Sequence, residues 1–395
     1  ISLGLVGSEM CIRDRYNGGT AMKNEPIDKD NKSQTQIVAF HLPQFHTFPE
    51  NDEWWGKGFT EWVNVKNAKP LYKGHNQPRV PLNNNYYDLS KIENMVAQMD
   101  LAREYGIHAF CYYHYWFDGK LLLQKPLEAI RDYQGVKLNY FLCWANEPWA
   151  RTWDGHETDV LMPQRYGDRL EWEQHFEYLL SFFKDQYYEK IDNKPVLVLY
   201  RCTSIPKCEE MIACWNQLCK QNGFDGIYII EEKNSFQNKP VCKNSNAYLY
   251  FEPGYTLNFG RTKFEHARDK AITVAFNLSK HSHNLVNVYS WIWQRLLFNT
   301  KKDLGQNDTG KEIFPGAFVG WDNTPRKKDK GRFIVGNTPE IFGKYFSRQF
   351  SQAKEAGCRY LFINAWNEWG EGAFLEPDET FEYSYLECIK DVSHT

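Results

Sequence analysis

The sequence predicts an α/β fold, a single (β/α)8 barrel of the TIM type. Eight short apolar runs recur along the chain, and their β-branched and aromatic residues are typical of buried parallel strands. Segments with a helical period lie between most of these runs, and several of them end at a glycine. The repeated order of strand, helix and glycine is typical of this barrel, and eight units match its closure. A doubly wound open sheet is the alternative, but no GxGxxG motif follows the first run.

The predicted strands are short, and most are followed directly by polar or aromatic residues. They are Gln36–Phe40, Ile107–Tyr112, Leu138–Trp144, Pro195–Tyr200, Gly226–Ile230, Ala247–Phe251, Ala317–Gly320 and Tyr360–Ala365. The predicted helices carry apolar residues at helical spacing, and they are Leu89–Tyr105, Trp172–Tyr187, Glu209–Gln221 and Pro339–Ala356. Two connections are too long for plain turns, and they are His41–Asn85 after the first strand and Pro253–Pro315 between the sixth and the seventh. We expect both to be functional rim loops, because long loops in compact domains usually are.

Composition and the chain ends limit the class of protein. The chain has 395 residues and a formal net charge of −3, which gives no reason to expect binding to nucleic acid or to an anionic membrane. One barrel domain over residues 34–390 is expected, and residues 1–33 are expected to be a non-native leader and a disordered tail, because Ile1–Arg15 resembles a translated sequencing-adapter artefact. No apolar run approaches the roughly 18 residues of a membrane helix. The N-terminal stretch also lacks the basic leader of a signal peptide, which favours a cytoplasmic protein. The 10 cysteines form no CxxC pair, so neither a metal site nor a cofactor is expected.

Carboxylates, imidazoles and aromatic rings gather just after the predicted strands. A carboxylate or an imidazole follows six of the eight strands, and aromatic residues, 16% of the chain, are interleaved with them. Carboxylates exchange protons with sugar oxygens and act at the anomeric centre, and aromatic faces stack on sugar rings. The pattern therefore predicts a glycan or polysaccharide substrate. The expected substrate-binding residues are His41, Gln44, His46, Glu61, Trp62, Tyr113, His114, Trp116, Asn146, Glu147, Trp149, Arg151, Glu252, Trp321, Asp322, Asn367 and Trp369.

Several of these residues also have a structural interpretation that the sequence leaves open. A histidine at a strand end is as well explained by a satisfied polar position in the core, which applies to all three of these histidines. Glu147 equally fits an ion pair with Arg151, and Glu61 with Trp62 equally fits core packing.

The strongest local pattern is a pair of glutamates near the C-terminal end. Glu368 and Glu371 are spaced i and i+3, which on a helical turn brings their Cβ atoms to roughly 5–6 Å from each other. Retaining glycosidases hold their two carboxyl groups about 5–5.5 Å apart, and repulsion between close carboxylates leaves an acid beside a base. The alternative is a pair of solvated side chains at a helix N-terminus. Flanking tryptophans and glycines favour the catalytic interpretation.

Six segments together resemble the WbsX family, whose members contain glycoside hydrolase family 99-like domains. Such proteins are often named as lipopolysaccharide-biosynthesis proteins or predicted glycosyltransferases. The segments are HLPQFH (41–46), WWGKGFTEWVNV (54–65), KPLYKGHNQPRVP (69–81), YYHYWFDGKLLLQKPLE (112–128), CWANEPWARTWDG (143–155) and NAWNEWGEGAFLEPD (364–378). The resemblance runs from about Gln36 to about Tyr385 and implies a (β/α)8 barrel that acts on glycans.

The resemblance also implies roles for the glutamate pair. Family 99 enzymes are retaining endo-α-mannosidases and mannanases, and their catalytic pair lies in a WNEWxEG segment that Trp366–Gly372 matches. Glu368 would be the base that removes the proton of the sugar 2-OH, so that O2 attacks the anomeric carbon and forms a 1,2-anhydro intermediate. Glu371 would protonate the leaving oxygen and later activate water or an acceptor. The third-strand motif ANEPW and the first-loop motif depart from family 99 proper, which leaves the sugar and the acceptor open.

Two other functions stay open at this stage. A glycosyltransferase or transglycosylase of O-antigen or surface-polysaccharide assembly fits the usual family name, although residues 34–390 contain neither a Gly-rich phosphate-binding loop nor a DxD motif. A non-catalytic glycan-binding barrel is the third interpretation. The presence of both Glu368 and Glu371 argues against it, because a binding protein does not need an acid beside a base.

Overall fold

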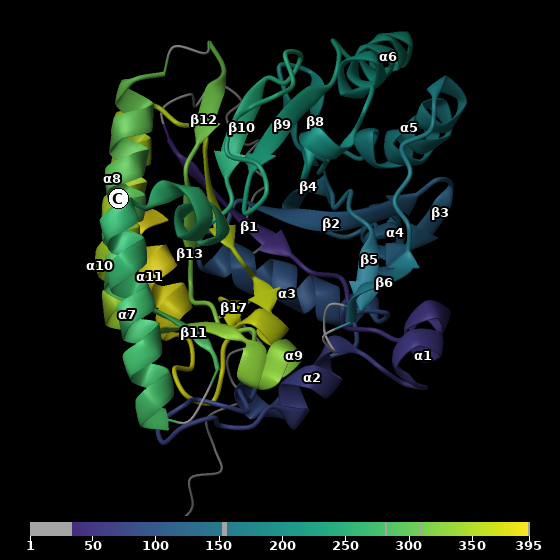
Figure 1. Ribbon diagram of the computed structural model, residues 1–395. Helices are drawn as coiled ribbons and strands as arrows, with labels where there is room; N and C mark the ends of the chain where they lie inside the picture. Colours follow the sequence, from purple (N-terminus) through teal and green to yellow (C-terminus); the bar gives the residue numbers. More distant parts are fainter. Residues whose placement is uncertain (1–33, 152–155, 281–282, 308–309, 394–395) are drawn as a thin grey trace, which may run out of the picture. The chain divides into compact units, whose positions relative to one another are not determined.

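The computed structural model describes residues 34–151, 156–280, 283–307 and 310–393, with the side chains of residues 151 and 156–159 outside this description. The predicted leader and tail, residues 1–33, therefore lie outside the described residues. The centre of the fold is a sheet of parallel strands (Figure 1). These strands are β1 (Gln36–His41), β2 (Ala109–Phe117), β4 (Asn139–Trp144), β8 (Lys194–Leu199), β9 (Tyr228–Lys233), β10 (Ala247–Tyr250), β12 (Glu312–Phe314), β13 (Gly316–Phe318) and β15 (Tyr360–Asn364).

The strands form a nearly closed barrel, which confirms the predicted fold class. Their order is β12-β10-β9-β8-β4-β2-β1-β15-β13, and each neighbouring pair on this path is parallel. Only Pro315 separates β12 from β13, yet β12 pairs with β10 and β13 pairs with β15. The two strands thus act as one seventh strand, interrupted where proline has no N–H to donate. The sequence predicted only the second half of this strand, as Ala317–Gly320.

Helices cover the outside of the barrel. They are α3 (Ile92–Glu104), α4 (Gln124–Asp132), α5 (Arg169–Phe183), α6 (Cys208–Gln221), α8 (Tyr289–Gly305), α10 (Pro339–Glu355) and α11 (Ser384–Ser393). Neighbours α8, α10 and α11 pack together at the left of Figure 1. Helix α10 begins as the sequence predicted, because Thr338 Oγ1 accepts a hydrogen bond from Ile341 N (3.4 Å) and Pro339 occupies the first turn.

Both long connections fold into rim structure. The first contains α1 (Pro49–Trp55), α2 (Glu61–Asn67) and η1 (Leu82–Asn84), and the second contains the π-helical turn η3 (Thr256–Gly260), α7 (Lys263–Lys280) and β11 (Leu285–Val288). Strand β11 pairs in parallel with β14 (Arg332–Val335), outside the barrel. The remaining short elements are β3 (Lys120–Leu122), β5 (Trp149–Arg151), β6 (His156–Met162), β7 (Lys190–Ile191), η2 (Cys202–Ser204), α9 (Thr324–Lys327), η4 (Lys328–Lys330), β16 (Asn367–Glu368), η5 (Trp369–Glu371) and β17 (Ala373–Phe374).

Most of the core is one large cluster of buried apolar side chains that runs through the barrel and under its helices, and a small second cluster contains Tyr248, Tyr250 and Ile313. Every residue of β2 is buried, as expected for a strand with a filled barrel on one face and helices on the other. Every helix among the described residues is too short or too polar to cross a lipid bilayer.

Candidate active site

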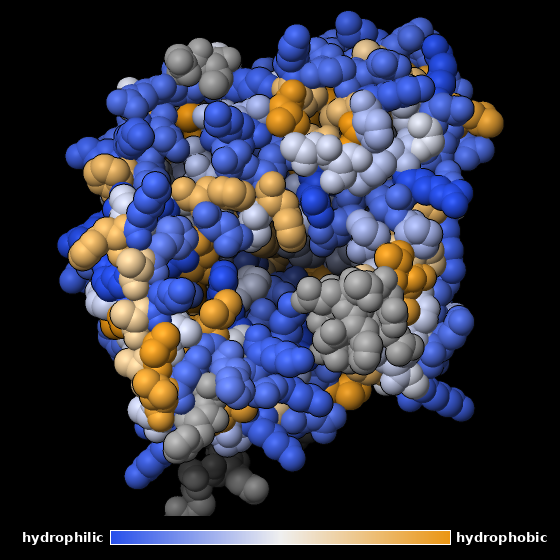
Figure 2. Space-filling model, viewed as in Figure 1, coloured by the Kyte–Doolittle hydropathy of each residue, from blue (hydrophilic) through white to orange (hydrophobic). Residues whose placement is uncertain are grey.

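A cavity of about 710 Å³ lies at the C-terminal ends of the barrel strands. Its lining comes from Tyr113 and Tyr115 of β2 and from the segments that follow β1, β4, β8, β9, β10, β13 and β15, which is where barrels of this type build active sites. The face drawn in Figure 2 is hollowed near its middle, in the region where Figure 1 draws α9, β17 and the hairpin of β5 and β6. The aromatic lining residues are Trp55, Tyr113, Tyr115, Trp149, Tyr200, Phe236, Phe251 and Trp321.

Arg326 lies at the centre of the charged part of this cavity. Its Nη1 donates to Glu371 Oε1 at 2.6 Å, and its Nη2 donates to Glu368 Oε2 at 3.2 Å. Its Nε donates to Glu61 Oε1 at 2.9 Å. One guanidinium therefore joins three carboxylates and holds Glu368 and Glu371 close to each other. Arg326, Glu368 and Glu371 line the cavity, whereas Glu61 is fully buried behind them.

Asp322 anchors the segment that carries Arg326. Its Oδ1 accepts hydrogen bonds from Thr324 N (3.0 Å) and Thr324 Oγ1 (2.6 Å), which fixes the start of α9. Its Oδ2 accepts from His75 Nε2 (2.9 Å), Gln77 Nε2 (2.7 Å) and Arg79 Nη2 (3.1 Å), all from the first rim loop. Burial favours the neutral acid, but Arg79 and His75 outweigh it and hold the pKa of Asp322 well below its usual range. Asp322 is thus an ionised support for α9.

Burial and charge together set the protonation of the glutamate pair. Burial raises the pKa of Glu368, and repulsion by Glu371 raises it further, while Arg326 opposes both effects. Burial likewise raises the pKa of Glu371, with Glu61 adding to the effect and Arg326 opposing it. Because one cation faces three carboxylates, the pair retains a proton to higher pH than free glutamates do. Arg326 lies closer to Glu371 than to Glu368, so in the ligand-free protein the shared proton is favoured on Glu368.

Glu376 fixes the tryptophans on either side of Glu368. Its Oε1 accepts from Trp366 Nε1 (3.0 Å), and its Oε2 accepts from Trp369 Nε1 (2.6 Å). Two further donors, Gln98 Nε2 (2.6 Å) and Tyr87 Oη (2.8 Å), complete its shell. Burial raises the pKa of Glu376 to about 7, although all four hydrogen bonds favour its ionised form. With both indole rings fixed, the backbone between them has little freedom.

Gly370 lies directly against the ion pair of Glu61 and Arg326. A Cβ on residue 370 would lie 2.0 Å from Glu61 Oε1 and 2.8 Å from Arg326 Nε. Gly370→Ala is therefore expected to displace the ion pair of Glu61 and Arg326 and to lower the free energy of unfolding by about 1–3 kcal/mol. Urea denaturation measures this. Gly305→Ala is the control, because a Cβ there meets no heavy atom within 4 Å. Equal stability of the two variants would contradict this arrangement of the turn.

Seven of the predicted residues line the cavity, and they are Gln44, Tyr113, Glu147, Trp149, Trp321, Glu368 and Glu371. Glu368 and Glu371 do not lie on a regular helix, since Glu368 ends β16 and Glu371 ends the 3-10 turn η5.

Glu147 pairs with Arg201, whose Nη1 lies 3.4 Å from Glu147 Oε2. The side chain of Arg151, the partner that the sequence suggested, lies outside the described residues.

The three predicted histidines do not reach the cavity. His41 Nε2 lies 3.0 Å from Gln98 Oε1 on α3, and His114 Nε2 lies 2.8 Å from His175 Nε2 on α5. His46 Nδ1 bonds the carbonyl of Pro43 at 2.9 Å. Side chains alternate along a strand, so with Tyr113 and Tyr115 facing the cavity, His114 between them faces the helices. None of the three side chains lines the cavity, so their role in substrate binding stays a prediction that this geometry does not favour.

The other predicted residues support the site from outside its lining. Asn367 Nδ2 donates to Leu42 O (3.0 Å) and its Oδ1 accepts from Leu42 N (2.7 Å), which ties the turn of Glu368 to the segment after β1. Asn146 Oδ1 accepts from Arg201 N at 2.9 Å. Glu252 Oε1 accepts from Thr256 Oγ1 at 2.8 Å. Three tryptophans and two acids complete this group, and none of the five lines the cavity: Trp62, Trp116, Trp369, Glu61 and Asp322.

Arg326 is the central residue that the sequence did not identify. It stands at the end of the run GAFVGWDNTPR, and its only sequence signal is its place four residues after Asp322, within the loop of the seventh strand. Tyr115, Tyr200 and Arg201 also line the cavity and were not among the predicted site residues. Among the described residues, no three His, Cys, Asp or Glu side chains are arranged to hold a metal ion.

Comparisons with solved structures agree with the fold. The GH99 endo-alpha-mannosidase from Bacteroides thetaiotaomicron, solved in complex with BIS-TRIS-propane, is 13% identical, with a TM-score of 0.56 over 91% of this chain and 97% of that chain. A structure titled "Glycoside hydrolase-like protein" is 12% identical, with a TM-score of 0.58 over 94% of this chain and 97% of that chain. At such identities the likeness concerns the fold alone.

Comparisons of sequence give the family. The protein described as "Uncharacterized protein WxcX" from Xanthomonas campestris pv. campestris (strain B100) is 36% identical over 360 residues, which are 90% of this chain and 49% of that protein. The chain thus spans about half the length of this curated relative. The family model described as "Glycosyltransferase WbsX" matches residues 37–389. The chain therefore belongs to the WbsX family.

Proposed function

We propose that the chain is a carbohydrate-active enzyme, a retaining endo-glycosidase that acts on bacterial polysaccharide or mannan-like glycans. The observation that carries the proposal is the pair of Glu368 and Glu371, joined by Arg326 at the wall of a cavity lined with aromatic rings. A paired acid and base acts on a glycosidic bond, and flat aromatic faces stack on sugar rings. The fold is like that of a GH99 endo-alpha-mannosidase, a barrel that can hold such a pair at the ends of its strands.

In the first step of the proposed reaction, the bond between the anomeric carbon and the leaving oxygen breaks. The carboxylate of Glu368 takes the proton of the sugar 2-OH, and O2 attacks the anomeric carbon to close a 1,2-anhydro ring. Glu371 gives its proton to the leaving oxygen, so that no charged alkoxide forms. In the second step Glu371 takes a proton from water, the water oxygen opens the ring at the anomeric carbon, and Glu368 returns its proton to O2. Two inversions give retention of configuration.

Substrate binding would move the shared proton to the acid. In the ligand-free protein the closer contact of Arg326 with Glu371 favours the proton on Glu368. A sugar 2-OH that donates to Glu368 stabilises its ionised form, because hydrogen bonds to a carboxylate lower its pKa. The proton then belongs on Glu371, facing the leaving oxygen. Arg326 thus keeps one proton on the pair, while that proton moves from Glu368 to Glu371.

A second candidate is sugar transfer through the same barrel. A sugar hydroxyl would then replace water in the second step, with Glu371 again as the base. The description of the family as a glycosyltransferase favours this candidate.

Product analysis by mass spectrometry separates the two candidates. Wild type and Glu371→Gln would be incubated with α-mannans and O-antigen polysaccharides in ¹⁸O water, with and without nucleotide sugars. We expect shortened oligosaccharides that carry one ¹⁸O atom with wild type alone. Lengthened products without ¹⁸O, formed with or without a nucleotide sugar, would instead establish transfer and reject the hydrolytic step.

A further inference from the structure

Arg332 is a half-buried cation on the cavity wall, and the described residues give it no counter-charge. It begins β14, and its backbone is fixed by Asn323, whose Oδ1 accepts from Arg332 N at 2.8 Å and whose N donates to Arg332 O at 3.1 Å. Within residues 34–151, 156–280, 283–307 and 310–393, no carboxylate or carbonyl accepts a hydrogen bond from its guanidinium. Burial and the nearby positive charge of Arg261 both lower the pKa of Arg332. A cation in such surroundings gains free energy when an anion binds beside it.

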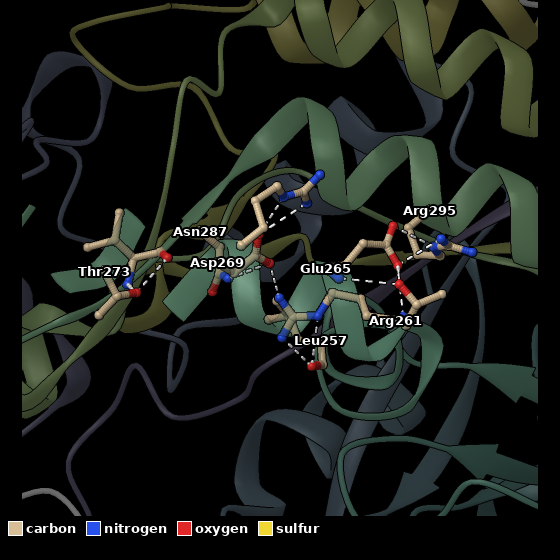
Figure 3. A network of polar contacts seen from close by, with 10 residues as sticks. Leu257, Arg261, Glu265, Asp269, Thr273, Asn287 and Arg295 are labelled. Carbon is tan, nitrogen blue, oxygen red and sulfur yellow. Dashed lines mark hydrogen bonds and ion pairs between the residues drawn. The ribbon is translucent and has the colours of Figure 1, made fainter. Parts of the chain in front are cut away.

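Two acidic residues of α7, the helix that packs on the partner strand of β14, already pair with other cations. Asp269 accepts from Arg261, from Arg268 Nε (3.1 Å) and from Asn287 Nδ2 (3.3 Å), as Figure 3 shows. Glu265, also drawn in Figure 3, pairs with Arg295. Both acids of this network are therefore already paired with cations other than Arg332.

Arg332 shares its face of the wall with an aromatic ring and further cations. Ile334 N donates to Trp321 O at 2.8 Å, and Asp322 pairs with Phe333 in an antiparallel bridge, so the segments of Trp321 and Arg332 run side by side. Trp321, Asn323 and Arg332 line the cavity, together with Lys327 and the exposed Lys330. The cations therefore lie on one wall, beside a ring that can stack on a sugar.

We propose that Arg332 and Lys330 form an anion-binding subsite next to Trp321, and that the glycan substrate carries a negatively charged substituent, a carboxylate, sulfate or phosphate. The identification of the bound glycan as the substrate rests on the proposed function, whereas the anion-binding site itself does not. A sugar stacked on Trp321 would direct its anionic group to the guanidinium of Arg332, whose paired N–H donors can bind two oxygens of a carboxylate, sulfate or phosphate. Lys330 would add attraction at the cavity mouth, where its side chain stays in water.

The test is a binding measurement that does not depend on turnover. Isothermal titration calorimetry with the Glu371→Gln protein would compare uronic-acid, sulfated and phosphorylated oligosaccharides with the same oligosaccharides after carboxyl reduction or removal of the sulfate or phosphate. We expect at least one acidic member to bind about tenfold more tightly than its neutral counterpart, the size of one charge-assisted hydrogen bond. Added Arg332→Gln should remove this preference, while neutral oligosaccharides bind as before.

Two further variants keep the test decisive. Lys330→Gln changes an exposed side chain, so it should fold normally and reduce both the preference and its dependence on salt. Arg348→Gln is the matched control, because it replaces an exposed arginine on α10 with glutamine. It should keep the full preference for acidic oligosaccharides. Equal binding of acidic and neutral members, or a preference that survives Arg332→Gln, would overturn the subsite. Binding of inorganic sulfate or phosphate alone, with no preference among the oligosaccharides, would overturn its assignment to a glycan.

Failure of this inference and failure of the proposed function give different results. If no oligosaccharide is cleaved in ¹⁸O water but the acidic preference depends on Arg332, the subsite stands and the hydrolase does not. If neutral glycans are cleaved and no acidic preference exists, the hydrolase stands and the subsite does not.

Discussion

Glu371→Gln is expected to lower kcat/KM for the cleaved glycan by about 10³-fold, because it removes the acid that protonates the leaving oxygen. Glu368→Gln is expected to cost at least as much, because without its base the 2-OH cannot attack the anomeric carbon. A rate loss alone does not separate the two roles, since both carboxylates share Arg326. Steady-state kinetics of both variants, with the exposed Glu387→Gln as the control, measure the losses.

The two roles separate when the leaving group needs no proton. With a dinitrophenyl glycoside of the sugar found in the products, Glu371→Gln should release a burst of the phenol and then stall, because no base activates water in the second step. Azide needs no deprotonation, so it should restore turnover and give a glycosyl azide of retained configuration. Glu368→Gln should show neither the burst nor the rescue. Azide rescue of Glu368→Gln in place of Glu371→Gln would reverse the two assignments.

The barrel could be predicted from sequence because its signals are local. Each predicted strand is a short apolar run, and in β1 every residue after Gln36 is buried. The seventh strand was predicted only in its second half, because it is interrupted at Pro315, where β12 and β13 pair with different neighbours. A local pattern does not show that two fragments on either side of a proline form one strand of a barrel.

The glutamate pair could likewise be predicted, because Glu368 and Glu371 stand three residues apart in one segment. Arg326 could not, because its contacts reach Glu61 across 265 positions of the chain and Glu371 across 45. Such a cluster exists only after the first and seventh rim loops meet. The sequence also could not predict which way the His114 side chain points, because that depends on which face of β2 the barrel places inward.

Arg326→Met is expected to destabilise the protein strongly near pH 8 and only slightly near pH 4.5. Removal of the guanidinium leaves the buried carboxylates of Glu61 and Glu368 and the partly buried carboxylate of Glu371 without their cation, and breaking a buried ion pair in this way costs about 3–5 kcal/mol of the free energy of unfolding. The exposed Arg348→Met is the matched control, because it removes the same group from the surface of α10. Urea denaturation of both variants and of wild type at each pH gives the differences.

The dependence on pH follows from the direction of the pKa shifts. In wild type the pKa values of Glu368 and Glu371 are already raised above the value of an unfolded glutamate, about 4.3, so the folded protein binds more protons than the unfolded chain at neutral pH. Stability from this proton binding is fully present below that unfolded pKa and is lost as pH rises through the raised folded pKa. Without Arg326 the folded pKa values rise further, so the loss continues to higher pH. A destabilisation that is equal at pH 4.5 and pH 8 would show that Arg326 does not act on the charge of the pair.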